Sequence, residues 1–194
     1  RLATSGIWRP VTLEFYDAAG IEDFYVHQES VNKELAKVNN VLEVKSVATA
    51  PQQAEVTLTY SYKNEPKVKE QKNVTLQPGC NEISLPIEIA NPHLWMPNGW
   101  GEAALYDFEL SVKVDGRVVA SEKKRIGLRT VKVVLEDDKD GKAFYFVVNG
   151  QPMFAKGSNF IPNDALLPNV TAERYYQLMK DVKDAHHNMI RVWG

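Results

Sequence analysis

The sequence predicts a mainly β chain, in which an immunoglobulin-like β-sandwich is followed by a short βαβ segment. Short runs that alternate apolar and polar residues recur along most of the chain, with turn signals between them. Asp115-Gly116 stands between two of these runs and is a strong two-residue hairpin signal. Towards the C-terminus the apolar spacing becomes that of a strand, a helix and a second strand.

Composition and charge narrow the functional classes. The 194 residues are 44% apolar and 10% aromatic, which is enough to bury a core. The formal net charge is -2 and opposite charges are interleaved, so neither nucleic acid nor a membrane surface is an expected partner. No stretch approaches the roughly 20 apolar residues of a transmembrane helix. The single cysteine, Cys80, cannot form an internal disulfide, and we interpret it as a small, partly buried residue.

The alternation of apolar and polar residues divides the first part of the chain into two segments. In residues 6–16 apolar and polar residues alternate from Val11 to Phe15, which predicts one strand without a nearby partner. About seven strands follow over roughly a hundred residues, the pattern of an immunoglobulin-like sandwich. We therefore separate residues 1–20 from a sandwich over residues 21–135.

Residues 143–194 are predicted to form a hairpin and one βαβ unit. The charged run 136–142 before them is interpreted as a linker or a hairpin tip. The hairpin has strands at residues 144–148 and 153–156, with Asn149-Gly150 at its turn.

A helix is predicted over residues 171–186. Thr171 suits the N-cap, and Glu173 in the first turn suits the positive end of the helix dipole. Apolar residues recur at spacings of three and four, at Tyr175, Leu178, Met179, Val182 and Ala185. With strands at residues 153–157 and 188–193, the helix makes a βαβ unit that needs further parallel strands beside it.

The last strand carries the first candidate site residue, Arg191. Side chains alternate along a strand, so Met189, Arg191 and Trp193 share one face, and Ile190 and Val192 share the other. If helices cover the outer face, Arg191 points inward and requires a carboxylate partner, for which no acid in the chain has an obvious claim. The alternative is a surface arginine in a salt bridge at the strand end.

The loop of residues 156–168 is the second candidate. It follows the first strand of the βαβ unit, and loops after strand C-termini build the active site in α/β barrels. Ser158, Asn159 and Asp164 are therefore placed where ligand contacts occur, and Asn and Asp suit sugar hydroxyls. The alternative is that these residues only cap turns.

Two further pairs have competing interpretations. Trp95 and Trp100, in a Pro- and Gly-rich loop, could stack on a sugar ring, but we prefer that they fix the loop to the sandwich or to a neighbouring domain. His186 and His187 are adjacent and lack the spacing of a metal pair, so a metal site is not expected. No cofactor is expected either.

Five motifs, taken in order, resemble glycoside hydrolase family 2: GIWRPV, the sandwich, LWMPNGWG...LY, FVVNGQPMFAKGSNFIPNDALLP and NMIRVWG. The resemblance covers the whole chain and is greatest to the β-mannosidase branch. The deciding stretch is GSNFIPNDALLP, because the β-galactosidase and β-glucuronidase branches usually have an Asn-x-His-Glu-Asp type sequence there. β-Mannosidases resemble this chain from Asn159 to Asp164.

The resemblance implies a domain order and a reaction. Residues 1–20 would be the last strand of a sugar-binding jelly roll, and residues 143–194 the incomplete start of a (β/α)8 TIM barrel. Such enzymes cleave terminal β-mannosides with retention, using two glutamates that stand on later barrel strands. Asn64-Glu65 and Asn81-Glu82 resemble the Asn-Glu pair of many retaining glycosidases, but we expect them to be surface residues of sandwich turns.

Roles for single residues also follow from the resemblance. Trp193 would line the mannose-binding subsite, Arg191 would hold the nucleophile glutamate ionised and oriented, and Asn159 and Asp164 would be pocket-loop residues. We therefore expect the chain to be a fragment of a retaining exo-β-mannosidase that acts on β-mannoside oligosaccharides or glycans. The fragment alone is expected to be inactive, because both catalytic glutamates lie outside it. The resemblance points to an extracytoplasmic (periplasmic) or lysosomal setting.

Two alternatives stay open at this point. A stand-alone immunoglobulin-like module that binds carbohydrate or protein predicts glycan binding that depends on Trp95 or Trp100. The second alternative is another exo-glycosidase of family 2, such as an exo-β-glucosaminidase, a β-galactosidase or a β-glucuronidase. Only sequence beyond Gly194 would distinguish such an enzyme from a β-mannosidase.

Overall fold

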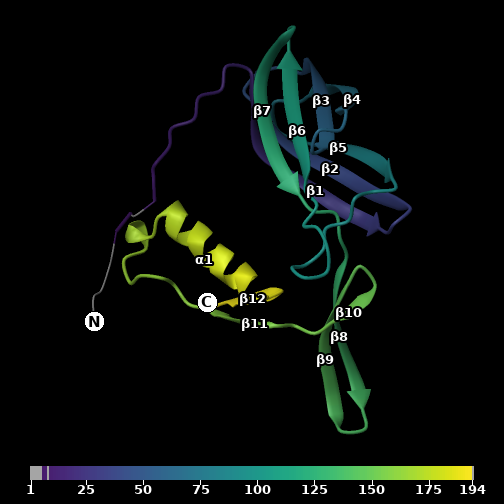
Figure 1. Cartoon of the computed structure of the whole chain (residues 1–194). Helices are drawn as coiled ribbons and strands as arrows, with labels where there is room; N and C mark the ends of the chain where they lie inside the picture. The colour runs from purple at the N-terminus through teal and green to yellow at the C-terminus, as the bar shows by residue number, and fades with distance from the viewer. Residues whose placement is uncertain (1–5, 8, 194) are drawn as a thin grey trace. The chain divides into compact units, whose positions relative to one another are not determined.

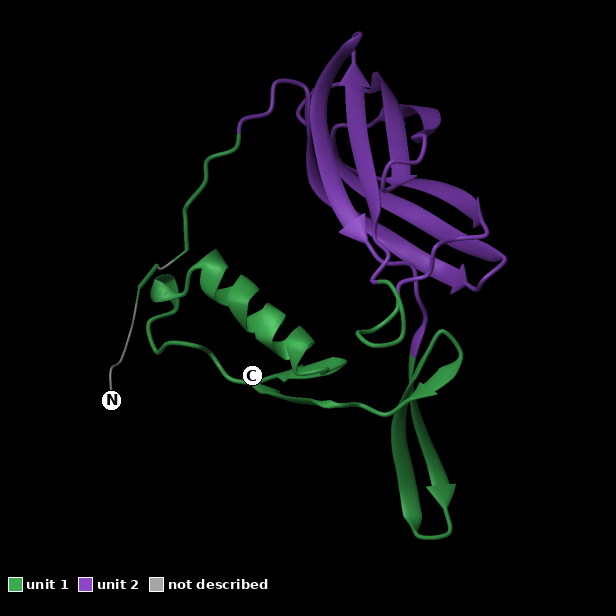
Figure 2. Ribbon diagram, viewed as in Figure 1, with its two compact units in different colours: residues 1–14, 96–102, 132–194 green, residues 15–95, 103–131 purple. Residues whose placement is uncertain are grey.

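The computed structural model describes residues 6–7 and 9–193, and the chain divides into two compact units (Figure 2). The larger unit contains residues 15–95 and 103–131, and the smaller contains residues 1–14, 96–102 and 132–194. No helix in the described part of the chain is long and apolar enough to cross a membrane.

The larger unit is a β-sandwich of two antiparallel sheets (Figure 1). One sheet has the strand order β1-β2-β5 and the other the order β4-β3-β6-β7. The strands are β1 (Ala19–Val31), β2 (Leu35–Ser46), β3 (Gln52–Tyr62), β4 (Val68–Leu76), β5 (Gly79–Ala90), β6 (Tyr106–Val114) and β7 (Arg117–Ile126). This is the immunoglobulin-like sandwich that the alternating runs predict.

The core lies between the two sheets, as the alternation along the central strands requires. Every second residue is buried over residues 54–62 of β3 and over residues 106–114 of β6. Leu58 and Leu110 lie opposite each other in the register and are both 0% exposed. Burying a leucine side chain stabilises a fold by about 1.5–3 kcal/mol, so the apolar set points inward and the polar set outward.

Three assignments at the sandwich need correction. β1 begins at Ala19, which is 1% exposed in the core and therefore belongs to the sandwich and not to residues 1–20. At the other end β8 (Val131–Asp138) belongs to a separate sheet, so the sandwich stops short of residue 135. Cys80 is exposed, because the inward positions of the edge strand β5 are the odd-numbered ones from Ile83 onward.

The strand predicted over residues 6–16 is absent from the described part of that stretch, and Trp8 lies outside the described residues. Val11, Leu13 and Phe15 are 80%, 80% and 85% exposed. A strand is completed by a ladder with a neighbouring strand, and none of the strand pairings among the described residues includes this stretch. That this segment ends a preceding domain stays a prediction.

The smaller unit begins with a sheet in the order β10-β9-β8, which contains β9 (Gly141–Val148) and β10 (Gln151–Met153). Residues 136–142 cover the end of β8, the turn at residues 139–140 and the start of β9, so they form a hairpin tip, the second of the two predicted alternatives. The turn at Asn149-Gly150 is confirmed, with φ of 49° and 78°. Asp115-Gly116 has φ of 48° and 76°, so both turns have the positive angles of a type I′ hairpin.

A parallel βαβ unit follows, formed by β11 (Gly157–Phe160), α1 (Ala172–Asp184) and β12 (Met189–Val192), with a short 3-10 helix, η1 (Leu167–Asn169), before α1. The helix begins as predicted, because the side chain of Thr171 accepts a hydrogen bond from the Arg174 N–H. The first strand was predicted at residues 153–157 and begins four residues later, because Met153 pairs with β9 instead.

Candidate functional site

Two of the predicted site residues meet on the parallel pair β11–β12. The register places Asn159 opposite Arg191, and Nη1 of Arg191 donates a hydrogen bond of 3.2 Å to Oδ1 of Asn159. Arg191 is exposed, and its side-chain partner among the described residues is this amide. The side chain therefore fits neither predicted alternative fully, since it is not buried and its partner is neutral.

The Asn159–Arg191 pair lies on the face of β11 and β12 that points away from α1. The Phe160 ring, next along β11, lies 6.3 Å from the ring of Tyr175 on the helix. Because neighbouring side chains point to opposite faces of a strand, Asn159 must face the other way, and its register partner Arg191 faces with it. The sequence predicted that Arg191 would lie on the inner face if a helix covered the outer face. The structure agrees, because α1 packs on the face opposite to Arg191.

Gly157 sets how closely the two strands approach. A Cβ at this position would overlap the carbonyl oxygen of Met189 and lie 2.8 Å from its carbonyl carbon. Both atoms belong to backbone that cannot move without breaking the strand pair. The glycine is therefore required by close packing of two main chains, and it stands two residues before Asn159.

Trp193 extends the pairing beyond β12. Its N–H donates a hydrogen bond of 2.9 Å to the carbonyl of Phe160, and its side chain is 53% exposed. Alternation gives Trp193 the same face as Arg191. An exposed indole and a guanidinium therefore lie on one face, a combination suited to contacts with a sugar ring and with an anion.

The other two loop residues do not join this face. Oδ1 of Asp164 accepts a hydrogen bond of 2.8 Å from the Leu166 N–H, which is the local turn interpretation. Ser158 and Asn159 lie on β11 and not in the loop after it, because the strand begins later than predicted. Ser158 faces the helix side, opposite to Asn159.

Two asparagines that the sequence did not single out hold the start of β12. Asn188 accepts a hydrogen bond of 2.8 Å from the Lys156 N–H and donates one of 3.0 Å to the Phe154 carbonyl. Asn98 donates from its side chain to the Lys183 carbonyl, in the last turn of α1, and to the His187 carbonyl, in the connection to β12. Asn188 lies in sequence between the predicted helix and the predicted last strand, so its place could have been recognised. Asn98 is 85 and 89 positions away from its two partners, and no local sequence pattern predicts such a contact.

Trp95 is a structural residue of the larger unit. The Arg129 guanidinium lies 4.1 Å from the centre of its ring, and a Cβ on Gly127 would lie 2.8 Å from three of its side-chain atoms. Its N–H donates to the Leu128 carbonyl at 2.9 Å. These contacts confirm the preferred interpretation, that Trp95 fixes its loop to the sandwich, and they cover its ring with a cation.

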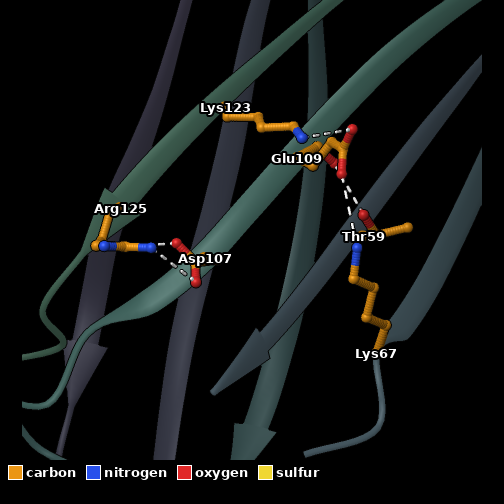
Figure 3. A network of polar contacts seen from close by, with 6 residues as sticks. All are labelled: Thr59, Lys67, Asp107, Glu109, Lys123 and Arg125. Carbon is orange, nitrogen blue, oxygen red and sulfur yellow. Dashed lines mark hydrogen bonds and ion pairs between the residues drawn. The ribbon is translucent and has the colours of Figure 1, made fainter. Parts of the chain in front are cut away.

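The outer face of the β3–β6–β7 sheet carries a network of charged side chains (Figure 3). Arg125 donates to both carboxylate oxygens of Asp107, at 2.7 and 3.3 Å, and this hydrogen bonding and charge raise the pKa of Arg125. Glu109 lies between two lysines, with Lys123 at 3.4 Å and Lys67 at 3.8 Å. Both carboxylates are neutralised by cations, so we interpret the network as cross-strand pairing and not as acid–base machinery.

Asn64-Glu65 is exposed, as expected, whereas Asn81-Glu82 lies within β5 and not in a turn, with Asn81 half-buried and Glu82 exposed. Glu65 lies 2.9 Å from Nε2 of His93, whose ring stacks on Tyr62 at 4.0 Å. The hydroxyl of Tyr106 accepts a hydrogen bond from the His93 N–H. Burial raises the pKa of Tyr106, and this hydrogen bond partly opposes the shift. Asn81 bonds to the carbonyls of its own turn.

The chemistry open to the β11–β12 face is therefore recognition and orientation. Arg191 can hold an anion, Asn159 can bond to a hydroxyl, and Trp193 can contact a ring. No carboxylate among the described residues bonds to Arg191, and residues 6–7 and 9–193 contain no cluster of three His, Cys, Asp or Glu side chains able to hold a metal.

The sandwich agrees with what is found among known proteins. Residues 19–129, more than half of the chain, match the family described as "Glycosyl hydrolases family 2". The chain belongs to this family.

Two relatives with more than 30% sequence identity to this chain are β-mannosidases. The chain is 37% identical over 193 residues to β-mannosidase B of Neosartorya fischeri, covering 100% of this chain and 22% of that protein. The solved β-D-mannosidase of Dictyoglomus thermophilum is 34% identical, with a TM-score of 0.91, over 98% of this chain and 23% of that one. An exo-chitosanase of Amycolatopsis orientalis, at 21% identity and a TM-score of 0.77 over 92% of this chain and 20% of that one, shares the fold. The chain thus spans about a fifth of the length of these relatives.

Proposed function

We propose that this chain is part of a retaining exo-β-mannosidase that hydrolyses terminal, non-reducing β-D-mannosides. The observation that carries the proposal is the placement of Asn159, Arg191 and Trp193 on one face of β11 and β12, opposite the helix. The identities of 37% and 34% to β-mannosidases support this substrate class over the other activities of the family.

Arg191 has the capacity to hold a catalytic carboxylate. A guanidinium has five N–H donors, and the hydrogen bond to Asn159 uses one of them. The remaining donors can bind a carboxylate side by side, and a positive charge at that distance keeps the carboxylate ionised, as a nucleophile requires. Asn159 in turn fixes the direction of the guanidinium, and Trp193 supplies an apolar surface for the sugar.

The two catalytic glutamates belong, in this proposal, to further strands of a (β/α)8 barrel that β11, α1 and β12 begin. Retaining enzymes hold their two carboxyl groups about 5 Å apart, across the scissile bond. The residues before β1 are proposed to end a preceding sugar-binding domain, and residues 143–194 to open the barrel. The isolated chain is therefore expected to be inactive.

The test compares the intact polypeptide that carries this chain with the 194-residue chain alone. We expect the intact polypeptide to hydrolyse 4-nitrophenyl β-D-mannoside in preference to the β-galactoside, β-glucuronide and β-glucosaminide, and the isolated chain to hydrolyse none of them. Preference for another glycoside would replace the substrate class. Turnover by the isolated chain would contradict the proposal that both catalytic glutamates lie outside it. Glycan binding by the isolated chain that is lost on Trp100→Ala would instead favour a stand-alone binding module.

A further inference from the structure

Residues 96–102 form a small closed loop that carries Asn98 at its tip. The loop is closed by the Met96 N–H, which donates a hydrogen bond of 2.9 Å to the Glu102 carbonyl. At the tip, the Trp100 N–H donates to the Pro97 carbonyl at 3.0 Å. Gly99 has φ of 84°, the angle that the third residue of a type II turn needs. Asn98 is therefore the second residue of a turn whose shape the backbone fixes.

Both N–H groups of the Asn98 amide are used at the end of α1. Nδ2 donates to the Lys183 carbonyl at 3.1 Å and to the His187 carbonyl at 3.0 Å. The Lys183 carbonyl belongs to the last turn of α1, at the negative pole of the helix, and it also accepts a hydrogen bond of 3.0 Å from the His186 N–H, so Asn98 adds a second donor to it. The His187 carbonyl immediately precedes Asn188 and β12. One side chain thus joins the last turn of the helix to the start of the site strand, and Figure 2 shows loop and helix in the same unit.

The connection between α1 and β12 turns through a residue in the left-handed region. His186 has φ of 56°, in the left-handed region that residues with a Cβ adopt at a cost. The His187 N–H then donates to the Val182 carbonyl at 3.1 Å, which turns the chain out of the helix. On its other side, the connection is fixed by Asn188 to the backbone of Phe154 and Lys156.

The loop itself is anchored away from its tip. Nδ2 of Asn149, in the turn between β9 and β10, lies 3.3 Å from Sδ of Met96 in hydrogen-bonding geometry. A Cβ on Gly101 would lie 3.2 Å from the Met96 side chain, so the two sides of the loop are in contact. Asn98 therefore projects from a loop whose base is held by hydrogen bonds at Met96.

We infer that Asn98 is a positioning residue for the face that carries Arg191 and Trp193. By holding the Lys183 and His187 carbonyls, it fixes where β12 begins, and the strand alternation then fixes where both side chains point. This inference rests on the proposed function for its catalytic consequence, whereas its structural part stands independently.

The experiment uses Asn98→Ala and Asn98→Asp in the intact polypeptide, with Asn73→Ala, an exposed asparagine of β4, as the matched control. Aspartate has the shape of asparagine but offers oxygens where the two carbonyls need N–H donors. Hydrogen–deuterium exchange of residues 185–193 is expected to rise about tenfold or more in both variants, because each loses the bonds to both carbonyls. The control is expected to match the wild type.

A second measurement separates positioning from simple loss of stability. If Arg191 holds the nucleophile, its displacement raises the pKa of that carboxylate, so the acid limb of kcat/KM against pH moves to higher pH in both Asn98 variants. A merely structural role would lower the melting temperature without moving that limb. The kinetics are compared well below the melting temperature.

Each outcome has a definite meaning. Unchanged exchange in both variants, or wild-type behaviour of Asn98→Asp, would overturn the inference whatever the activity. Raised exchange with an unmoved acid limb would overturn the positioning role. If the unmodified polypeptide does not hydrolyse β-mannosides, the proposed function fails, and the exchange data alone decide whether Asn98 holds β12.

Discussion

Replacing Gly157 by alanine is expected to separate β11 from β12. The added Cβ would overlap the Met189 carbonyl oxygen and lie 2.8 Å from its carbonyl carbon, closer than real Cβ contacts allow. The obstacle is backbone, so no side chain can turn away. Forcing atoms into a packed site costs about 1–3 kcal/mol, and the register that joins Asn159 to Arg191 is lost with the pair.

The assay is hydrogen–deuterium exchange of the intact polypeptide, read at the Trp193 N–H, which donates to the Phe160 carbonyl. A local cost of 1–3 kcal/mol corresponds to roughly 5- to 150-fold faster exchange at this amide. Ser158→Ala is the matched control, because it changes the next residue of the same strand without adding an atom to the contact. Exchange in Gly157→Ala equal to that of Ser158→Ala would refute the argument from close approach.

Three further predictions concern α1 and the sandwich. Thr171→Ala removes the acceptor for the Arg174 N–H and should lower the free energy of unfolding by about 1 kcal/mol, measured by urea denaturation. His186→Gly, at φ of 56°, should slow exchange at the end of α1 by relieving a strain of about 1 kcal/mol; faster exchange would show that the imidazole has another role. Burial, and then the charge of Glu70, raise the pKa of Tyr60 above 10.0, so its contribution to stability is complete below pH 10.0 and is lost as pH rises through the folded pKa. Tyr60→Phe should therefore flatten the fall of the urea midpoint above that pH, and an unaltered fall would assign it to other groups.

The elements that the sequence predicted are those whose signals are local. Alternation is imposed by burial on one face of a strand, so β3 and β6 could be recognised without their partners. The cap at Thr171 and the turn at Asp115-Gly116 depend on only a few neighbouring residues. These features could be predicted because the residues that cause them are adjacent in the chain.

The errors arose where pairing across the chain decides the outcome. β8 alternates like a sandwich strand, and only its pairing with β9 excludes it from the sandwich. β11 is short and polar, and it is a strand because β12 lies beside it. The contact of Asn98 with the Lys183 carbonyl spans 85 positions, and no periodicity within a helix or strand encodes it. The Asn159–Arg191 contact could be anticipated only in part, because each residue was singled out but their register was not.

The most direct test of the account is the activity of Arg191→Lys in the intact polypeptide towards 4-nitrophenyl β-D-mannoside. Lysine keeps the positive charge but loses the planar fork of donors that can bind Asn159 and a carboxylate together. Because misplacing a reacting group by about 1 Å costs roughly 100-fold in rate, we predict a fall in kcat/KM of about that size with the fold unchanged by circular dichroism. Wild-type activity in Arg191→Lys would contradict the claim that the β11–β12 face forms part of a β-mannosidase active site.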